Sequence, residues 1–158
     1  MQKNPLTLES QKLLDSTGNQ ILWELQQDAR LSYAELGRRV NLSTPSVLER
    51  VRKLEHFGII IGYHTIIAPE KLGLSITALI RLNVPGDKSL QVYQKLAQMP
   101  EIFECYHVTG DNTYMLKAMV SCVKRLENLI ARIAVHGQPT TSLVLSSSIP
   151  RQLIQINV

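Results

Sequence analysis

The feature that most limits the range of folds open to this chain is a pair of helix-start signals separated by one short helix. Ser32 opens an S-x-x-E capping box, which predicts a helix over residues 33–40. Asn41 follows, and asparagine readily ends a helix in the left-handed conformation. Ser43 supplies a second N-cap, and Pro45 stands in the first turn of a longer helix, where its missing N–H is not needed. Two helices joined by so tight a turn have the spacing of a helix-turn-helix.

The longer of these helices has two chemically different faces. At about 100° per residue, Val47, Val51 and Leu54 fall on one face, which marks that face as the core side. The opposite face carries hydrogen-bonding and charged groups, and the stretch 38–53 holds five basic residues against the single acid Glu49. A helix of this kind fits a DNA major groove, although a solvated face on an ordinary domain gives the same pattern.

The pattern assigns a role to each polar side chain of this region. The candidates for contact with base edges are Ser43, Thr44, Ser46 and Glu49. The candidates for contact with phosphates are Arg38, Arg39, Arg50, Arg52 and Lys53. For Arg38 and Arg39 a surface salt bridge, for instance with Glu35, is an open alternative. The recognition helices of a dimer would enter successive major grooves, about 10 base pairs or roughly 34 Å apart.

The residues before the helix-turn-helix predict one more helix. Asp15 or Ser16 starts it, and it runs to about Gln27 with an apolar stripe that includes Ile21. Residues 1–13 are polar and lack a convincing period, which predicts a loose N-terminal arm.

A short β-branched stretch after the recognition helix predicts a wing. Residues 59–61 and 63–67 would form two strands around Gly62 and complete a winged helix-turn-helix over residues 14–63. Residues 64–73 then act as a linker strand and turn.

From residue 74 the apolar period changes from helical to alternating. The predicted elements are a strand over 74–84, a helix over 88–98, strands over 102–109 and 114–120, a helix from Ser121 with Val123, Leu126, Ile130 and Ile133 on one face, and a strand over 140–149. This βαββαβ order is the ferredoxin-like arrangement, so the chain is α+β, with a C-terminal ferredoxin-like sandwich over residues 74–149 and a tail over 150–158. One sheet face should carry both helices. The other is mixed and far from fully polar, which indicates that a second subunit covers it.

Composition allows a DNA partner without requiring one. The 158 residues give room for one medium domain or two small ones, and a net charge of +4 with a pI near 9.2 is compatible with a polyanionic partner. Bases and acids are nearly balanced in each half, so the nucleic-acid argument rests on local clustering. The chain shows no signal peptide or membrane-spanning apolar run, and we expect a cytoplasmic protein that does not associate with a membrane.

The residues that most often carry catalysis or bind metals form no recognisable set. The four histidines are His56, His64, His107 and His136. No two of them have H-x-x-x-H spacing, and the two cysteines, Cys105 and Cys122, form no C-x-x-C pair. A nucleophile needs an orienting base and an oxyanion site, and neither is recognisable. We therefore predict no catalytic residue, no metal site and no cofactor.

Three stretches of the chain resemble the Lrp/AsnC family of transcriptional regulators, in order and in spacing. They are ILWELQQDARLSYAELGRRVNLSTPSVLERVRKLEHFGIIIGY, then LGL, then ECYHVTGDNTYMLKAMV, and the resemblance covers about residues 14–149. It implies a regulator whose N-terminal domain reads double-stranded DNA and whose C-terminal domain assembles subunits and senses a small molecule, usually an amino acid. It also implies dimers formed by sheet-to-sheet packing and, in many members, octamers of four dimers.

The resemblance further places an effector between subunits, near the loop HVTGDNTY. The residues that it assigns there are Gly110, Asp111, Asn112, Thr113 and Tyr114. The family usually has an acid directly before the tyrosine, and this chain has Thr113 there instead. An acid can pair with the ammonium group of an amino acid, whereas threonine supplies no charge. We interpret the change as an altered effector choice or the loss of an amino-acid response.

Two other functions stay open at this point. Sirohaem decarboxylases, enzymes of tetrapyrrole metabolism, resemble this family in both domains, and Arg81, Lys117 and His107 would then have to bind the substrate carboxylates. A coloured protein with a Soret band would favour that enzyme, whereas salt-sensitive retardation of promoter DNA favours a regulator. A protein that compacts DNA with little sequence preference is the third possibility, and competition with unrelated DNA separates it from a specific regulator.

Overall fold

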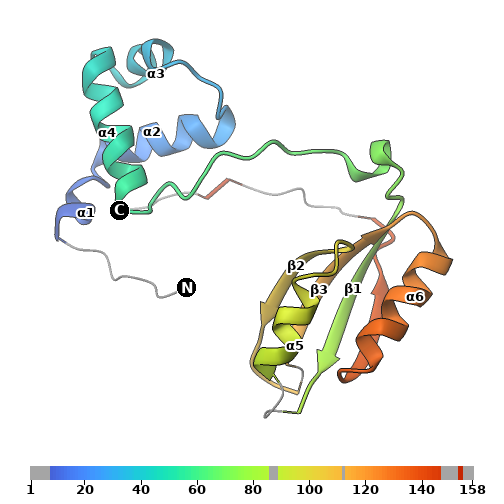
Figure 1. Cartoon of the computed structure of the whole chain (residues 1–158). Helices are drawn as coiled ribbons and strands as arrows, with labels where there is room; N and C mark the ends of the chain where they lie inside the picture. The colour runs from blue at the N-terminus through green and yellow to red at the C-terminus, as the bar shows by residue number, and fades with distance from the viewer. Residues whose placement is uncertain (1–7, 86–88, 112, 147–152, 155–158) are drawn as a thin grey trace. The chain divides into compact units, whose positions relative to one another are not determined.

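The computed structural model of the chain describes residues 8–85, 89–111, 113–146 and 153–154 (Figure 1). The chain divides into two compact units. The first consists of Met1–Ile66 together with Ile149–Val158, and the second of Ile67–Ser148. Residues 153–154, the described part of the predicted C-terminal tail, therefore belong with the N-terminal helices.

Four helices are described in the first unit. They are α1 (Leu8–Lys12), α2 (Ser16–Gln27), α3 (Tyr33–Val40) and α4 (Thr44–His56). The predicted loose arm is thus wrong for residues 8–12, which form α1, while residues 1–7 lie outside the described part. Leu13 and Leu14 follow α1 directly and pack against the core of this unit, which holds the short helix in place.

The predicted helix starts and the left-handed end are confirmed. Asp15 accepts a hydrogen bond from the Gly18 N–H at 2.7 Å, and Ser32 accepts one from the Glu35 N–H at 3.1 Å. Asn41 has φ 55° and ψ 41°, the left-handed conformation that closes α3. The S-x-x-E box is only half formed, because the Glu35 carboxylate pairs with arginines of its own helix.

The turn between α3 and α4 depends on a glycine. A Cβ placed on Gly37 would lie 2.6 Å from the Leu42 carbonyl oxygen, and the Leu42 N–H bonds to the Gly37 carbonyl at 2.9 Å. The backbone therefore approaches itself too closely for any side chain here. Below the turn, Leu36, Val47 and Val51 are fully buried, so the predicted inner face of α4 is confirmed.

The predicted wing is wrong. Residues 59–67 are described, and none of them is in a strand. The N–H groups of Ile59 and Ile60 bond instead to the Leu54 carbonyl, and both side chains pack on the helical core. With these residues used to end α4, the remaining stretch is too short to form a hairpin with a buried face, and it continues as an exposed connection.

The second unit is a four-stranded antiparallel sheet with two helices. After a 3-10 turn, η1 (Pro69–Leu72), its elements are β1 (Ile76–Asn83), α5 (Ser89–Leu96), β2 (Ile102–His107), β3 (Tyr114–Val120), α6 (Val123–Ala134) and β4 (Gln138–Leu143). The strand order is β2-β3-β1-β4, and each neighbouring pair is antiparallel. The predicted ferredoxin-like βαββαβ order is confirmed.

Both helices cover one face of this sheet (Figure 1). The core between sheet and helices contains Ile80, Leu82, Leu116, Ala118, Leu96, Leu129 and Ile133. The predicted alternation of the first strand is confirmed in β1, where Ala78, Ile80 and Leu82 are buried and the residues between them are exposed. Strand β3 alternates in the same way, buried at every second residue from Tyr114 to Val120.

Several details of this unit differ from the prediction, and β1, α5 and β2 are each shorter than the predicted 74–84, 88–98 and 102–109. The N-cap of α6 is Cys122 rather than Ser121. The buried stripe of α6 contains Leu129, while Val123 lies at the edge of that stripe and is 57% exposed. Strand β4 runs over Gln138–Leu143 rather than 140–149, of which residues 147–149 lie outside the described part. It includes Pro139, which is tolerated because β4 is an edge strand.

Candidate nucleic-acid interface

The outer face of α4 is an open surface of mixed chemistry. It holds a hollow of about 360 Å³ lined by Pro45, Leu48, Glu49, Arg52, Lys53 and His56. These residues recur at three- and four-residue intervals and lie opposite the buried stripe of the helix. The contacts predicted from the sequence do not include Pro45, Leu48 and His56, although the helical period alone places them on this face.

The serines at the start of α4 are partly engaged in capping. The Ser43 hydroxyl accepts the Ser46 N–H at 3.4 Å, and the two hydroxyl oxygens lie 2.8 Å apart. Thr44 stands between them and is exposed. The Thr44 hydroxyl makes no hydrogen bond to any residue that the structure describes, so the first turn of α4 offers it for contact, with Ser46 beside the cap.

Arg50 lies on the flank of α4 and points back into its own unit. Its guanidinium donates to both carboxylate oxygens of Asp15, at 2.9 and 3.0 Å. These hydrogen bonds hold the pKa of the Asp15 carboxyl below its usual value, although partial burial opposes the shift. The same carboxylate caps α2, so the pair joins two helices.

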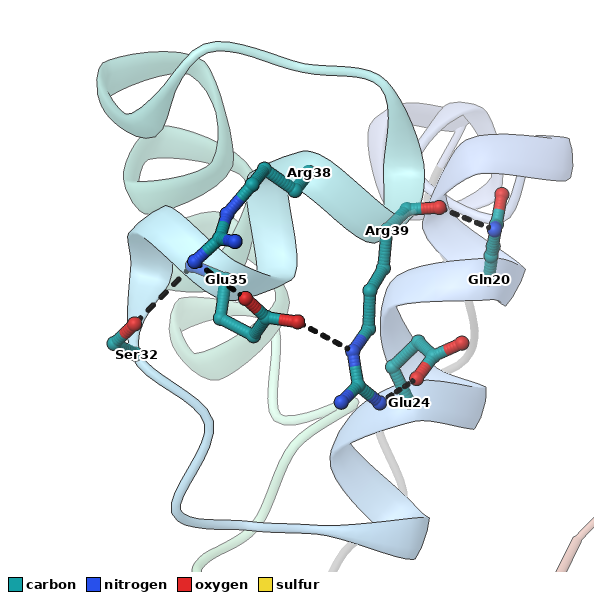
Figure 2. A network of polar contacts seen from close by, with 6 residues as sticks. All are labelled: Gln20, Glu24, Ser32, Glu35, Arg38 and Arg39. Atoms are coloured by element: carbon teal, nitrogen blue, oxygen red, sulfur yellow. Dashed lines mark hydrogen bonds and ion pairs between the residues drawn. The ribbon is translucent and has the colours of Figure 1, made fainter.

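Arg38 and Arg39 also have carboxylate partners, as the salt-bridge alternative predicted (Figure 2). Arg39 lies 2.8 Å from Glu24 on α2 and 3.2 Å from Glu35, and these two carboxylates raise the pKa of Arg39. Its backbone carbonyl accepts a hydrogen bond from Gln20 at 2.8 Å. Arg39 thus joins α2 to α3, whereas Arg38 makes one 2.6 Å pair with Glu35 and its side chain is 77% exposed.

The last two cations of the set lie next to each other on α4 but differ in their partners. Lys53 pairs with Glu49 one turn earlier at 2.6 Å, and this contact lowers the pKa of Glu49. Arg52 is exposed and makes no ion pair with any of the described residues. It is therefore the cation on this face that a phosphate or a base edge would reach without breaking a salt bridge.

The predicted effector loop lies in the second unit, between β2 and β3. Thr113 accepts a hydrogen bond from the Val84 N–H at 3.0 Å and donates one to the Val84 carbonyl at 2.9 Å. Tyr114 is only 3% exposed and lies in the core, with its ring 5.3 Å from that of His107. Gly110 and Asp111 are exposed, and Asn112 lies outside the described residues.

The described residues offer neither a metal-binding cluster nor a helix that could span a membrane. They contain no cluster of three or more His, Cys, Asp or Glu side chains placed to hold a metal ion. In the same part of the chain, no helix combines the length and the apolar character needed to cross a membrane.

Comparison with known proteins identifies both units. An AsnC-type helix-turn-helix domain matches residues 14–55, and the Lrp/AsnC ligand binding domain matches residues 77–154. The chain is 43% identical to the HTH-type transcriptional regulator YezC of Bacillus subtilis, over 85% of this chain and 96% of that protein. It is 39% identical to the proline dehydrogenase transcriptional activator of Rhodobacter capsulatus, over 89% of this chain and 95% of that protein.

Solved structures agree with these matches. The structure of Bacillus subtilis LrpC superposes with a TM-score of 0.83 at 35% identity, covering 87% of this chain and 99% of that one. A Neisseria meningitidis transcriptional regulator in complex with L-methionine superposes with a TM-score of 0.82 at 28% identity, covering 89% and 96%. With the helix-turn-helix and the ferredoxin-like sheet both in place, the chain belongs to the Lrp/AsnC family of transcriptional regulators.

Proposed function

We propose that this protein regulates transcription by laying the outer face of α4 in the major groove of specific DNA sites. The observation that carries the proposal is the two-sided character of α4, with Val47 and Val51 fully buried and the opposite face open and polar. A helix docked in this way reads bases from its exposed side without any change in its own fold.

The contacts within the first unit refine the roles of the candidate residues. Thr44, Ser46 and Glu49 remain the candidates for base edges, and Leu48 joins them as an apolar group suited to a thymine methyl. Arg52 is the leading phosphate candidate because it makes no competing ion pair with the described residues.

The other basic side chains fall into two groups according to the ion pairs that they make with carboxylates. Arg38 and Lys53 make exposed pairs within one helix, which contribute little and can be exchanged for phosphate. Arg50 makes both of its bonds to Asp15 at the start of α2, and Arg39 makes one bond to Glu24 on α2 and one to Glu35 on its own helix. We assign both arginines to holding the helices together. Ser43 has a capping role.

Dimerisation would use the sheet face that the two helices leave open. Leu79 and Tyr106 are 42% and 56% exposed there, beside a Lys117–Glu104 pair at 3.0 Å. An exposed apolar surface framed by paired charges suits a second copy of the same face. Leu79→Arg is expected to convert dimers, or octamers built from them, into monomers in light scattering coupled to size exclusion. An unchanged mass would refute this interface.

An effector would bind near Gly110, Asp111, Asn112, Thr113 and Tyr114. The Neisseria meningitidis relative was solved with L-methionine, which supports a small-molecule role for this domain. In this chain the Thr113 hydroxyl is occupied by Val84, so it offers a ligand neither charge nor a free donor. We therefore propose an effector that does not depend on an acid at this position, or no amino-acid response. Calorimetric titration with the twenty amino acids tests the point, and tight leucine or asparagine binding at this loop would refute it.

We assign the protein a binding role in the cytoplasm and no catalytic reaction. The test is gel retardation and footprinting on the DNA upstream of its own gene, with unrelated DNA as competitor. A discrete footprint that resists unrelated competitor supports a specific regulator. Equal competition by unrelated DNA would indicate an architectural protein, and absence of retardation at low salt would contradict DNA binding.

A further inference from the structure

Residues 153–154 are the described part of the C-terminal tail, and Ile154 bonds to the end of α2 in the first unit. The Ile154 N–H donates to the Gln26 side-chain oxygen at 2.8 Å, and the Gln26 side-chain nitrogen donates to the Ile154 carbonyl at 3.1 Å. Gln26 and Ile154 both belong to the first unit, although 128 positions separate them in the sequence. One side-chain amide thus satisfies both backbone groups of a tail residue, as a neighbouring β-strand would.

The chemistry of this contact selects glutamine but not a particular tail side chain. A primary amide carries a donor and an acceptor in one plane, and a carboxylate carries acceptors alone. The Ile154 side chain is 70% exposed, so the backbone bonds rather than apolar burial hold the residue. Leu153, the other described residue of the tail, is half-buried. Gln27, the next residue of α2, makes no side-chain hydrogen bond to the described residues.

The contact adds a second tether between the units. The first tether runs from Tyr63, whose hydroxyl donates to Glu55 at 2.9 Å, to the start of β1 at Ile76, and it spans at most roughly 45 Å. The second runs from Val144, whose N–H bonds to Thr77, to residue 153, and it spans at most roughly 32 Å. The connection that ends at the docked residues 153–154 is therefore shorter than the connection from Tyr63 to Ile76, and it sets the smaller maximum separation of the units.

We propose that residues 153–154 form a C-terminal clasp, defined by the Gln26–Ile154 pair, and that the occupant of the Gln26 site is the tail of the same chain. When the clasp is closed, the DNA-binding unit is held by two connections. When it is open, the longer connection alone limits its reach. Exposed hydrogen bonds contribute little net stability, so closed and open forms interconvert readily.

Hydrogen exchange on the full chain tests the clasp directly. Gln26→Ala removes both bonds and is expected to speed exchange of the Ile154 amide about 3- to 10-fold, while the control Gln27→Ala leaves it unchanged. Gln26→Glu keeps an acceptor for that N–H but loses the donor, and should give an intermediate rate. Trp23, the only tryptophan, lies less than one turn from Gln26 and reports whether α2 itself is disturbed. Equal exchange in wild type and Gln26→Ala, with unchanged Trp23 emission, would overturn the proposal.

Mixed oligomers identify the occupant. Ile154→Pro removes the N–H that Gln26 receives. In oligomers mixed from Gln26→Ala chains and Ile154→Pro chains, neither chain can close a clasp within itself. Ile154 of the Gln26→Ala chains should therefore exchange as fast as in the pure variant. Restored protection in the mixture would show that the tail crosses to a neighbouring subunit and would overturn a clasp within one chain.

The consequence for DNA rests on the proposed function and is measured separately. An open clasp gives each DNA-binding unit more reach, so Gln26→Ala should lose part of the wild-type preference between half-site spacings that differ by a few base pairs. Gln27→Ala should keep that preference. Equal spacing preference in both variants would remove the tethering role of the clasp, whereas failure of wild type to bind any DNA would instead contradict the proposed function.

Discussion

Arg50 and Asp15 form a two-bond ion pair, at 2.9 and 3.0 Å, that ties the middle of the recognition helix α4 to the N-cap of α2. The sequence predicts Arg50 as a phosphate contact, whereas in the structure its guanidinium bonds to Asp15 and connects α4 to the start of α2. The same carboxylate accepts the Gly18 N–H, so one side chain both starts a helix and orients another.

This pair should make stability depend on pH in acid. The pKa of Asp15 is lowered in the fold, chiefly by the Arg50 hydrogen bond, from a usual value of 3.8. A lowered native pKa stabilises the fold above about pH 4, and that stabilisation is lost as the pH falls through the native value. Urea unfolding of wild type and Asp15→Asn should differ at neutral pH by less than about 1 kcal/mol, since Asp15 is partly exposed.

The difference between those two proteins should shrink as the pH is lowered below 3.8. Other carboxyls with lowered pKa values, such as Glu49 and Glu101, titrate in both proteins and cancel in the comparison. A difference that stays constant from neutral pH into acid would show that the Asp15 charge contributes nothing.

Arg52 and Arg50 should differ in their effect on DNA binding. Arg52→Ala is expected to weaken binding to specific and unrelated sequences alike and to reduce the salt slope by about one, because a phosphate contact is lost. Arg50→Ala should instead lower the unfolding midpoint and leave the salt slope unchanged. Gel retardation over a range of salt concentrations measures both. If Arg52→Ala leaves the DNA affinity and its salt dependence unchanged, the assignment of Arg52 to a phosphate contact is wrong.

Gly37→Ala should destabilise the helix-turn-helix. The new methyl would meet the Leu42 carbonyl oxygen at 2.6 Å, so the turn into α4 must shift, at a cost of about 1–3 kcal/mol. Thermal unfolding measures the loss, and DNA affinity should fall with it because α4 changes its angle. Gln27→Ala, an exposed position on α2, is the control. A wild-type midpoint for Gly37→Ala would mean that the turn relaxes freely.

Thr113 should stabilise the second unit through its neutral hydroxyl. Thr113→Val removes both bonds to Val84 and leaves a partly buried N–H and carbonyl unpaired, with an expected cost of about 1–3 kcal/mol. Thr113→Ser keeps both bonds and serves as the matched variant. Urea unfolding should rank them wild type, serine, valine, with serine near wild type. Equal loss in both variants would show that the methyl group, and not the hydroxyl, matters here.

The sequence by itself determined the elements whose signals are local. The caps at Asp15, Ser32 and Ser43, the left-handed end at Asn41 and the alternation along β3 each involve residues within a few positions of one another. Propensity and periodicity therefore suffice for them, and the same reasoning places Arg52 on the outer face of α4.

The tertiary structure decided which polar groups are free and where weak elements end. Arg50 bonds to Asp15, which lies 35 positions away in the sequence, and Gln26 bonds to Ile154, which lies 128 positions away. No local sequence pattern carries information over such separations. The wing prediction was wrong for a different reason: the N–H groups of Ile59 and Ile60 bond to the Leu54 carbonyl, and their side chains pack on the helical core instead of pairing in a short hairpin. An arginine or lysine that folding places beside a carboxylate forms an ion pair within the protein, and one without such a neighbour stays available to DNA. The positions of those carboxylates are fixed by the packing of the whole unit.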